Sequence, residues 1–462
     1  MNPTIGLEVH VQLQTGKKLF CSCPSDFAAP PNTRVCPVCL GLPGTLPVLN
    51  QEAVILALRA ALVLGCTINT LSSFDRKHYF YPDLPKGYQI TQQRQPLAIG
   101  GRVETPLGIV DIKRLHLEED AAKLVHTAEG TLIDYNRSGM ALVEIVTAPC
   151  LTSPGAAKSF LQFLRQVLLY AGISDCKLEE GSLRCDANIS LQGGGRTEIK
   201  NLNSFKAVER ALVYEIQRQR RAIARGEKVR PETLRWDEAQ AKTVPMRAKG
   251  IAAEYLYLPE PDLPPLYADA ALVEKARMGL PELPRSRAAR FVRQYGLPPE
   301  RAELLTATRE MADCFEEIAA KGATPLAAAN LLLGEVSRLL NAGGELPAAG
   351  QLARLLALQE AGSISVKAAK EVLARMSARG ESVDNILKQE NFLQISDPEA
   401  LAELAQEVIA ANPGATADYL KGKTKALGYL MGAAMKASQG RANPESLKKI
   451  LAQKLAERPK KY

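Results

Sequence analysis

The segment IGLEVHVQL near the amino terminus places a carboxylate and an imidazole two residues apart. Apolar residues occupy the odd positions of residues 5–13, an alternation that is typical of a half-buried β-strand. Glu8, His10 and Gln12 therefore share the second face of the predicted strand. This face is either simply solvated, as is common in antiparallel sheets, or it is the floor of a site where the two reactive groups bind one ligand.

Further carboxylates lie in two later segments. RLHLEED contains the adjacent Glu118 and Glu119, and ALVEIVTAP contains Glu144 within an otherwise apolar strand. Burying a lone carboxylate is costly unless a cation or a metal pairs with it. If Glu144 and one glutamate of the pair meet Glu8 and His10, the donors are hard oxygens with one imidazole, which favours Mg²⁺ or Mn²⁺ over zinc. Strand alternation does not choose between Glu118 and Glu119, and separate surface carboxylates are the alternative.

Four cysteines form two close pairs, Cys21 with Cys23 and Cys36 with Cys39. Each pair can supply one edge of a tetrahedron, which is the geometry that zinc needs. Four thiolates leave no open coordination position, so the predicted zinc is structural. Four unligated thiols are the alternative.

The segment FDRKHYFYPDLPKGYQITQ combines cations, among them Lys77 and Lys86, with aromatic rings around turn residues. Cations and aromatics on a loop suit phosphate, a nucleotide or single-stranded RNA, whereas an aromatic-rich hairpin is the simpler interpretation. The sequence contains neither a P-loop nor a G-x-G-x-x-G motif, so we expect a sheet and its metal to bind any ATP. It also has no G-x-S-x-G elbow and no Ser/Lys arrangement of the amidase type.

The net charge of +8 is concentrated at the carboxyl end. Residues 421–462 contain eleven Lys and Arg against two Glu, so the rest of the chain is close to neutral. Such a patch is expected where a protein binds a phosphate backbone, although a solubilising helix surface has the same composition.

The composition, 46% hydrophobic and 23% charged, is typical of a globular protein of about three domains. The longest apolar run is too short to cross a bilayer, and we expect no membrane association. No basic-then-apolar leader opens the chain, so we expect a cytoplasmic protein. In that compartment nine cysteines serve as thiols or metal ligands rather than as a disulfide framework.

Strand-like patterns dominate residues 1–285, and helices interrupt them without a regular βαβ repeat. Residues 183–191 alternate cleanly, and the glycines at 193–195 predict a hairpin after them. Ser153 and Pro154 have the residue types of a helix cap and first turn. These patterns predict an α+β domain with a largely antiparallel sheet.

A proline-rich stretch, LPEPDLPPL followed by LPELPRSR, predicts a domain boundary near residue 285. Beyond it the apolar spacing is helical to the end of the chain. QISDPEAL has the signature of a newly capped helix, so we divide this half into a helical domain at 286–395 and a basic tail domain at 396–462.

Six ordered motifs resemble one known family. They are IGLEVHVQLQT, FDRKHYFYPDLPKGYQITQ, RLHLEEDAAK, EGSLRCDANISL, IKNLNSF and PEPDLPPL. They are similar to those of the B subunits of the tRNA-dependent amidotransferases, which convert Asp-tRNA(Asn) and Glu-tRNA(Gln) to the Asn and Gln forms. The resemblance extends over essentially the whole chain.

The resemblance implies a glutamine-hydrolysing carbon–nitrogen ligase that works as a heterotrimer. A glutaminase A subunit would release ammonia, and a small C subunit would hold the other two together. This chain would bind the misacylated tRNA, phosphorylate its side-chain carboxylate with ATP and Mg²⁺, and let ammonia displace the phosphate. The cognate aminoacyl-tRNA synthetase is a further partner that the resemblance admits. The implied fold is a cradle-shaped relative of glutamine synthetase, followed by a helical domain and a tail domain of the YqeY type.

By likeness to the metal site of the family, His10, Glu119 and Glu144 would be Mg²⁺ ligands, with Glu8 and Glu118 beside them as catalytic groups. A divalent ion is expected there because a carboxylate and a phosphoryl group repel until their charges are neutralised.

The remaining site residues also follow from the resemblance. Lys77 and Lys86 match lysines near the ammonia route and the acceptor pocket, where they would also stabilise an acyl phosphate. The four cysteines at 21–39 match a zinc site that some members have. The tail would grip the tRNA through a set of basic residues: Lys421, Lys423, Lys425, Lys436 and Arg441.

One position departs from the family pattern. Leu256 stands where an arginine is common before PEPD, which puts the charge contact of that arginine in doubt. Two other functions compete. A non-catalytic, zinc-containing tRNA-binding scaffold would explain the cysteines and the tail but not Glu8, His10 and Glu144. A stand-alone amide ligase of the glutamine synthetase type would leave the tail charge without a role.

Overall fold

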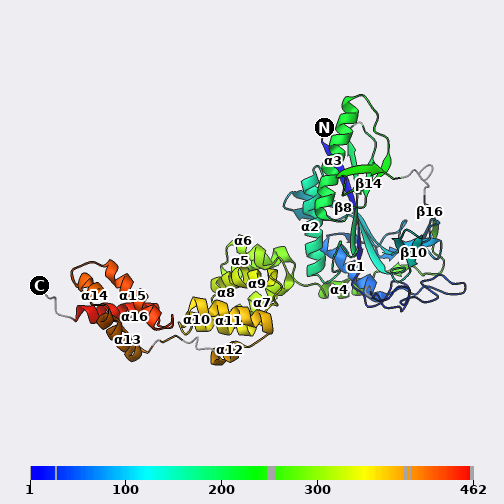
Figure 1. Cartoon of the computed structure of the whole chain (residues 1–462). Helices are drawn as coiled ribbons and strands as arrows, with labels where there is room; N and C mark the ends of the chain where they lie inside the picture. The colour runs from blue at the N-terminus through cyan, green and yellow to red at the C-terminus, as the bar shows by residue number, and fades with distance from the viewer. Residues whose placement is uncertain are drawn as a thin grey trace. The chain divides into compact units, whose positions relative to one another are not determined.

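The computed structural model describes residues 2–26, 29–192, 194–246, 255–389, 394–395 and 397–457. The chain divides into two compact units, residues 1–283 and 284–462. The strands belong to the first unit and the second is helical (Figure 1). Among the described residues, none of the helices combines the length and the apolar character that crossing a bilayer would need.

A ten-stranded sheet forms the centre of the first unit. From edge to edge its strands are β15 (Lys242–Pro245), β14 (Glu232–Asp237), β13 (Thr197–Lys200), β12 (Leu183–Leu191), β1 (Pro3–Gln12), β11 (Ala141–Thr147), β8 (Gly108–Glu119), β6 (Ala98–Ile99) and β2 (Thr67–Ile68), and β7 (Arg102–Thr105) also pairs with β8. In the described part of this sheet β13 and β14 pair in parallel, and the other neighbours pair antiparallel. The predicted α+β class is confirmed, and the likeness of the sheet to glutamine synthetase stays a prediction.

Helices cover one face of this sheet. In the described part of the first unit the helices are α1 (Gln51–Val63), α2 (Pro154–Tyr170), α3 (Phe205–Ala224) and α4 (Ala270–Met278). The apolar side of β1, at Leu7, Val9 and Val11, shares one hydrophobic core with the buried faces of α1, α2 and α3. Because successive side chains of a strand point to opposite faces, this packing leaves Glu8 and His10 on the face that the core does not use.

Short sequence signals, a helix cap and a hairpin turn, fix where two of these elements begin or end. α2 begins where the sequence predicts, since the Ser153 hydroxyl accepts a hydrogen bond from the Ala156 N–H and Pro154 takes the first turn. The hairpin predicted after residues 183–191 is confirmed by the antiparallel pairing of β12 with β13. Gly193 itself lies outside the described residues.

The described part of the first unit also contains three small sheets. They pair β16 (Leu256–Pro259) with β4 (Asp75–His78) and β5 (Tyr88–Thr91), β3 (Leu71–Ser72) with β17 (Leu266–Tyr267), and β9 (Lys123–His126) with β10 (Thr131–Asp134). β4 and β5 form an antiparallel hairpin, so the segment of cations and aromatics is a hairpin rather than an open loop. Lys77 lies on β4 and Lys86 on the connection to β5.

The described residues of the second unit form two separate hydrophobic cores. The first belongs to α5 (Pro284–Tyr295), α6 (Pro299–Leu305), α7 (Arg309–Ala320), α8 (Pro325–Leu331), the π-helical turn η1 (Leu332–Val336), α9 (Ser337–Asn341), α10 (Ala349–Glu360), α11 (Val366–Arg379) and α12 (Val383–Gln389). The second belongs to α13 (Pro398–Ala411), α14 (Pro413–Leu420), α15 (Lys425–Ala437) and α16 (Pro444–Ala456). Residues 390–393 and 396, between the two cores, lie outside the described residues.

Truncating Leu7 tests the packing of β1. Leu7 is 1% exposed and lies in the core of the first unit. Leu7→Ala is expected to lower the free energy of unfolding by about 2–5 kcal/mol, because it removes buried methyl groups and leaves a cavity. Chemical denaturation of the full chain measures this, and Leu132→Ala, at a site 64% exposed, is the matched control. Equal stability of the two variants would contradict the packing described.

Candidate functional site

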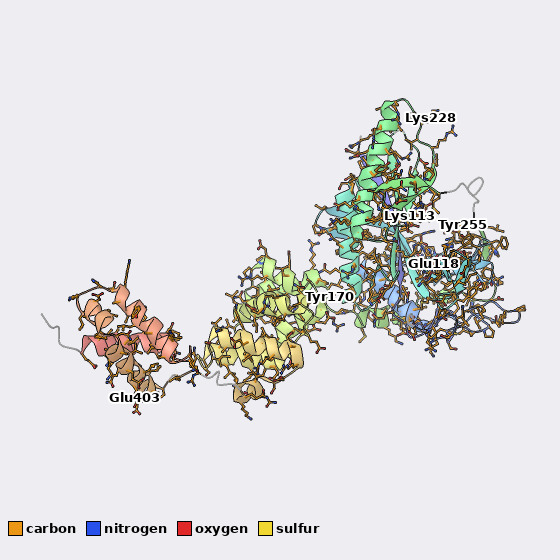
Figure 2. All side chains as sticks on the ribbon, in the orientation of Figure 1. Lys113, Glu118, Tyr170, Lys228, Tyr255 and Glu403 are labelled. Carbon is orange, nitrogen blue, oxygen red and sulfur yellow. The ribbon has the colours of Figure 1, made fainter. Side chains whose placement is uncertain are left out.

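The strand register aligns four chemically active residues across the sheet. His10 on β1 pairs with Glu144 on β11 and with Arg184 on β12, and Glu144 in turn pairs with His116 on β8. Residues opposite one another in neighbouring strands point to the same face. Glu118 follows His116 by two residues on β8 and therefore belongs to the same face. Figure 2 labels Glu118 on the sheet of the first unit.

Three of these side chains converge. His10 Nε2 lies 3.3 Å from Glu118 Oε1 and 3.5 Å from Glu144 Oε2. One donor atom from each residue fits within 4.8 Å of the others. Glu118 is 2% exposed and Glu144 7%, so two carboxylates share a buried space with one imidazole. Such a donor set, mainly oxygen with one nitrogen, fits a hard divalent cation such as Mg²⁺ or Mn²⁺.

The electrostatics of the three side chains require positive charge between the carboxylates. Burial raises the pKa of Glu118, but its hydrogen bond with His10 and the charges of His10 and Lys77 together leave the pKa lowered. Burial also acts against the charge of Glu144, yet the charge of His116 and the hydrogen bond with His10 hold its pKa well below the usual range. The pKa of His10 is lowered by burial and raised more by its hydrogen bonds to Glu118 and Glu144, to about 10. A proton on His10 and a bound cation are two ways to satisfy the same pair of carboxylates.

Glu119 lies elsewhere, which corrects the placement implied by the family resemblance. Its Oε1 accepts hydrogen bonds from Lys86 Nζ and, at 2.9 Å, from the Ile90 N–H. The reason is the alternation of β8, which turns adjacent residues to opposite faces. The structure therefore brings Glu118, and not Glu119, to His10 and Glu144.

The two remaining predicted residues of this site lie beside the carboxylates. Glu8 is two residues before His10 on the same face of β1, and its Oε1 accepts a hydrogen bond of 3.0 Å from Asn188 Nδ2. Burial, followed by the charge of Glu144, raises its pKa. Lys77 Nζ lies 4.8 Å from the ring centroid of Tyr255. Burial opposes the charge of Lys77, but the charges of Glu118, Tyr257 and Glu144 together outweigh it, so the lysine pKa is raised.

His116 is a site residue that sequence reasoning missed. It is 1% exposed, and its Nε2 lies 3.2 Å from Glu144 Oε2. The signal was present, because His116 precedes Glu118 by two residues in RLHLEED and so belongs to the same strand face.

The four predicted zinc ligands also converge. Cys21, Cys23, Cys36 and Cys39 bring their sulfurs within 4.8 Å of one another. A hydrogen bond from Cys21 is the largest influence on Cys39 and lowers its pKa to about 4, with a contribution from the charge of Lys18. The arrangement fits a tetrahedral zinc ion bound by the four cysteines as thiolates.

Lys18 places a positive charge next to the four sulfurs. It is 0% exposed, and its Nζ lies 3.6 Å from Cys39 Sγ and donates to the Tyr135 carbonyl at 3.3 Å. Within the described residues no carboxylate forms an ion pair with it. A buried ammonium needs negative charge nearby, and four thiolates holding a zinc ion would carry it.

A cavity of about 200 Å³ connects the cysteine loop with the hairpin of Lys86. Cys21, Cys39 and Gly41 line it on one side, and Lys86 and Glu119 line it on the other. Gly41 has a φ of +68°, and a Cβ built on it would lie 2.3 Å from Lys86 Cγ. Only glycine permits so close an approach in this conformation.

Comparison with known families places the chain. The model of the GatB/GatE catalytic domain matches residues 3–274, which include both predicted metal sites. The chain belongs to the GatB family. A second model, described as the GatB domain, matches residues 313–455. Its name also includes YqeY, and it extends over most of the helical domain as well as the tail, whereas we expected the YqeY type only after residue 395.

Curated GatB relatives are similar over their full length. The B subunits of the aspartyl/glutamyl-tRNA(Asn/Gln) amidotransferases from Carboxydothermus hydrogenoformans and Moorella thermoacetica are 48% and 47% identical to this chain. The alignments cover 98% of this chain and 98% and 99% of those proteins. The protein of the same name from Geobacillus kaustophilus is 47% identical, with 98% of this chain and 99% of its own length covered.

The five basic residues predicted to bind tRNA lie at or near the two ends of α15. Lys421 and Lys423 follow α14, and Lys425 begins α15. Lys436, in the last turn of α15, is also exposed, whereas Arg441 is half-buried and donates a hydrogen bond to the Ser438 carbonyl. The three lysines on the α14–α15 connection form the denser group, although Lys423 also pairs with Asp418 at 3.0 Å.

Removing a thiolate or the buried ammonium tests the zinc site. Elemental analysis of the purified protein is expected to find a single zinc per chain, and Cys39→Ser is expected to lose it. Lys18→Met keeps the volume but removes the charge, and it should weaken zinc retention against a chelator by about 10–100-fold. Cys66→Ser, outside the four-cysteine group, is the control. Zinc-free wild-type protein would contradict the assignment.

Proposed function

We propose that this chain is the transamidase subunit of a tRNA-dependent amidotransferase. It would act on Asp-tRNA(Asn), Glu-tRNA(Gln) or both, activating the side-chain carboxylate of the misplaced amino acid with ATP. The observation that carries the proposal is the convergence of His10, Glu118 and Glu144 within one buried space. The full-length similarity to amidotransferase B subunits supports the same reaction.

The reaction has two steps. A carboxylate oxygen of the aminoacyl group attacks the γ-phosphorus of ATP, and ADP leaves. Ammonia then attacks the acyl carbon of the acyl phosphate, inorganic phosphate leaves, and a proton is lost to give the amide. Both steps bring anionic or electron-rich groups together, so the protein must supply positive charge and alignment.

His10, Glu118 and Glu144 are the residues that would hold the divalent cation, with Glu118 in place of the Glu119 that the family resemblance implied. When bound, the cation would neutralise the carboxylate and the γ-phosphate. Glu8 lies along the same face of β1, where its carboxylate accepts from Asn188 and would help to orient the reacting groups.

Lys77 is proposed to stabilise the acyl phosphate. Burial lowers the pKa of Lys77, but the charges of Glu118, Tyr257 and Glu144 together raise it more, and its Nζ lies 4.8 Å from the ring centroid of Tyr255. A fixed cation at this place lowers the energy of a transition state that develops negative charge on phosphate oxygens.

Lys86 and Glu119 are proposed to act on the ammonia side of the reaction. They form an ion pair at the wall of the cavity beneath the cysteine loop. A carboxylate paired with a lysine can hold ammonia by hydrogen bonds and accept a proton as the amine attacks. The ammonia would come from a glutaminase A subunit held by a small C subunit, since this sequence has no amidase nucleophile motif.

The tail is proposed to bind the tRNA body. Exposed lysines at 421, 423, 425 and 436 can neutralise backbone phosphates. We propose further that the chain works in the cytoplasm as part of a heterotrimer that acts on misacylated tRNA, with the cognate synthetase as a further partner. The proposed fold of its first unit is a cradle like that of glutamine synthetase.

Replacing His10 tests the catalytic assignment. In the assembled complex with misacylated tRNA, His10→Ala is expected to lower ATP hydrolysis by orders of magnitude, because it removes a cation ligand. Glutamine hydrolysis by the partner should largely survive. His126→Ala, an exposed histidine on β9, is the matched control. ATP hydrolysis equal to wild type in His10→Ala would favour the non-catalytic scaffold instead.

Neutralising the lysines of the α14–α15 connection tests the tail. In the full chain, Lys421→Gln with Lys423→Gln and Lys425→Gln should weaken tRNA binding. The triple substitution should also make the slope of log K for tRNA binding against log salt concentration shallower by about 2 to 3, since each phosphate contact contributes about 0.9 or less to that slope. Lys367→Gln on α11, 89% exposed at its side chain, is the control. A slope that does not change would count against the tail as the tRNA grip.

A further inference from the structure

His116 lies behind the proposed cation site and has no role in the reaction described so far. It occupies β8 two residues before Glu118, and its cross-strand partner on β11 is Glu144. With 1% of its surface exposed, it is among the buried polar residues of the sheet. A buried imidazole between two buried carboxylates calls for an explanation in terms of the hydrogen bonds that it makes.

The two histidines contact the carboxylates in different ways. His10 Nε2 lies 3.3 Å from Oε1 of Glu118, whereas His116 Nε2 lies 3.9 Å from Oε2 of the same residue. Both reach Oε2 of Glu144, at 3.5 Å from His10 and 3.2 Å from His116. The closest of these contacts is that of His116 with Glu144. The carboxylates are therefore bracketed by two imidazoles.

The hydrogen-bond inventory of His116 identifies which ring nitrogen is the donor. Nδ1 is buried and has no hydrogen-bond partner among the described residues. A proton on Nδ1 would be a buried donor without an acceptor, whereas a proton on Nε2 can be donated to the nearby carboxylate. The three-residue group whose donor atoms converge contains His10, Glu118 and Glu144 but not His116. These observations separate His116 from the ligands.

We propose that His116 is a positioning residue, whose Nε2–H fixes the carboxylate of Glu144 so that this glutamate, together with Glu118 and His10, presents its oxygens to a divalent cation. The inference rests on the cation site of the proposed function. Carboxylates and imidazoles that bind metals are commonly oriented by a second hydrogen bond from the protein, and removing it typically costs 10–100-fold in metal affinity. Without the donor, Oε2 of Glu144 loses the shorter of its two imidazole contacts in a buried space and keeps only the contact of 3.5 Å with His10.

Mn²⁺ binding to the full chain tests the proposal, with Mn²⁺ as a spectroscopic probe for the hard cation. His116→Ala is expected to weaken Mn²⁺ binding by about 10–100-fold, and His116→Gln should recover most of it because its side-chain amide offers an N–H near the position of Nε2. His116→Leu fills the buried volume without a donor and should behave as His116→Ala does. If the donor-less variants bind Mn²⁺ as tightly as wild type, or if His116→Gln is as weak as they are, the proposal is overturned.

The nitrogen coupling of bound Mn²⁺ distinguishes a positioning residue from a ligand. One imidazole nitrogen, from His10, is expected in pulsed electron paramagnetic resonance of the wild type and of His116→Gln. Two coupled imidazoles would overturn the positioning role. His126→Ala should leave both readouts unchanged.

His10→Ala separates this inference from the proposed function. If His10→Ala loses Mn²⁺ binding while the His116 variants keep it, the cation site stands and the positioning role of His116 fails. If His10→Ala binds Mn²⁺ as wild type does, the cation site itself fails, and the role of His116 fails with it.

Discussion

Two buried carboxylates on neighbouring strands impose the main constraint on this protein. Glu118 and Glu144 are both nearly inaccessible to solvent, and each contacts the same imidazole. Two negative charges in a space of low polarity repel strongly, so a proton or a cation must join them. The rest of the first unit supports this arrangement, because helices cover the other face of the sheet and fix the strands that carry the residues.

The side chains around Glu118 and Glu144 come from different parts of the first unit and carry different chemical groups. The imidazoles of His10 and His116 lie in line with Glu144 across the sheet, and Lys77 lies on β4 of the small sheet of β4, β5 and β16. The carboxylate of Glu119, one residue away along β8, belongs to a different environment with Lys86. A single strand thus contributes to two environments, one on each of its faces.

Sequence patterns predicted the strand face of Glu8 and His10, the capped helix α2 and the hairpin after β12, because each depends on residues close together in the chain. The choice between Glu118 and Glu119 depends instead on the register of β8 against β11, which local alternation does not give. His116 was missed although the alternation pointed to it, since the acidic run that follows it is the stronger signal. The convergence of the four cysteine sulfurs was predictable because two close thiol pairs are the usual sequence signature of a four-cysteine zinc site.

Gly41 joins two parts of the first unit that are distant along the chain. Its backbone lies so close to the side chain of Lys86 that no β-carbon fits between them, and its positive φ disfavours any other residue. The ribbon that carries the sulfurs therefore rests directly on the lysine at the cavity wall. Adding a single methyl group at this point would force the two parts to separate, so the spacing of the four-cysteine loop from the Lys86–Glu119 ion pair depends on this one glycine.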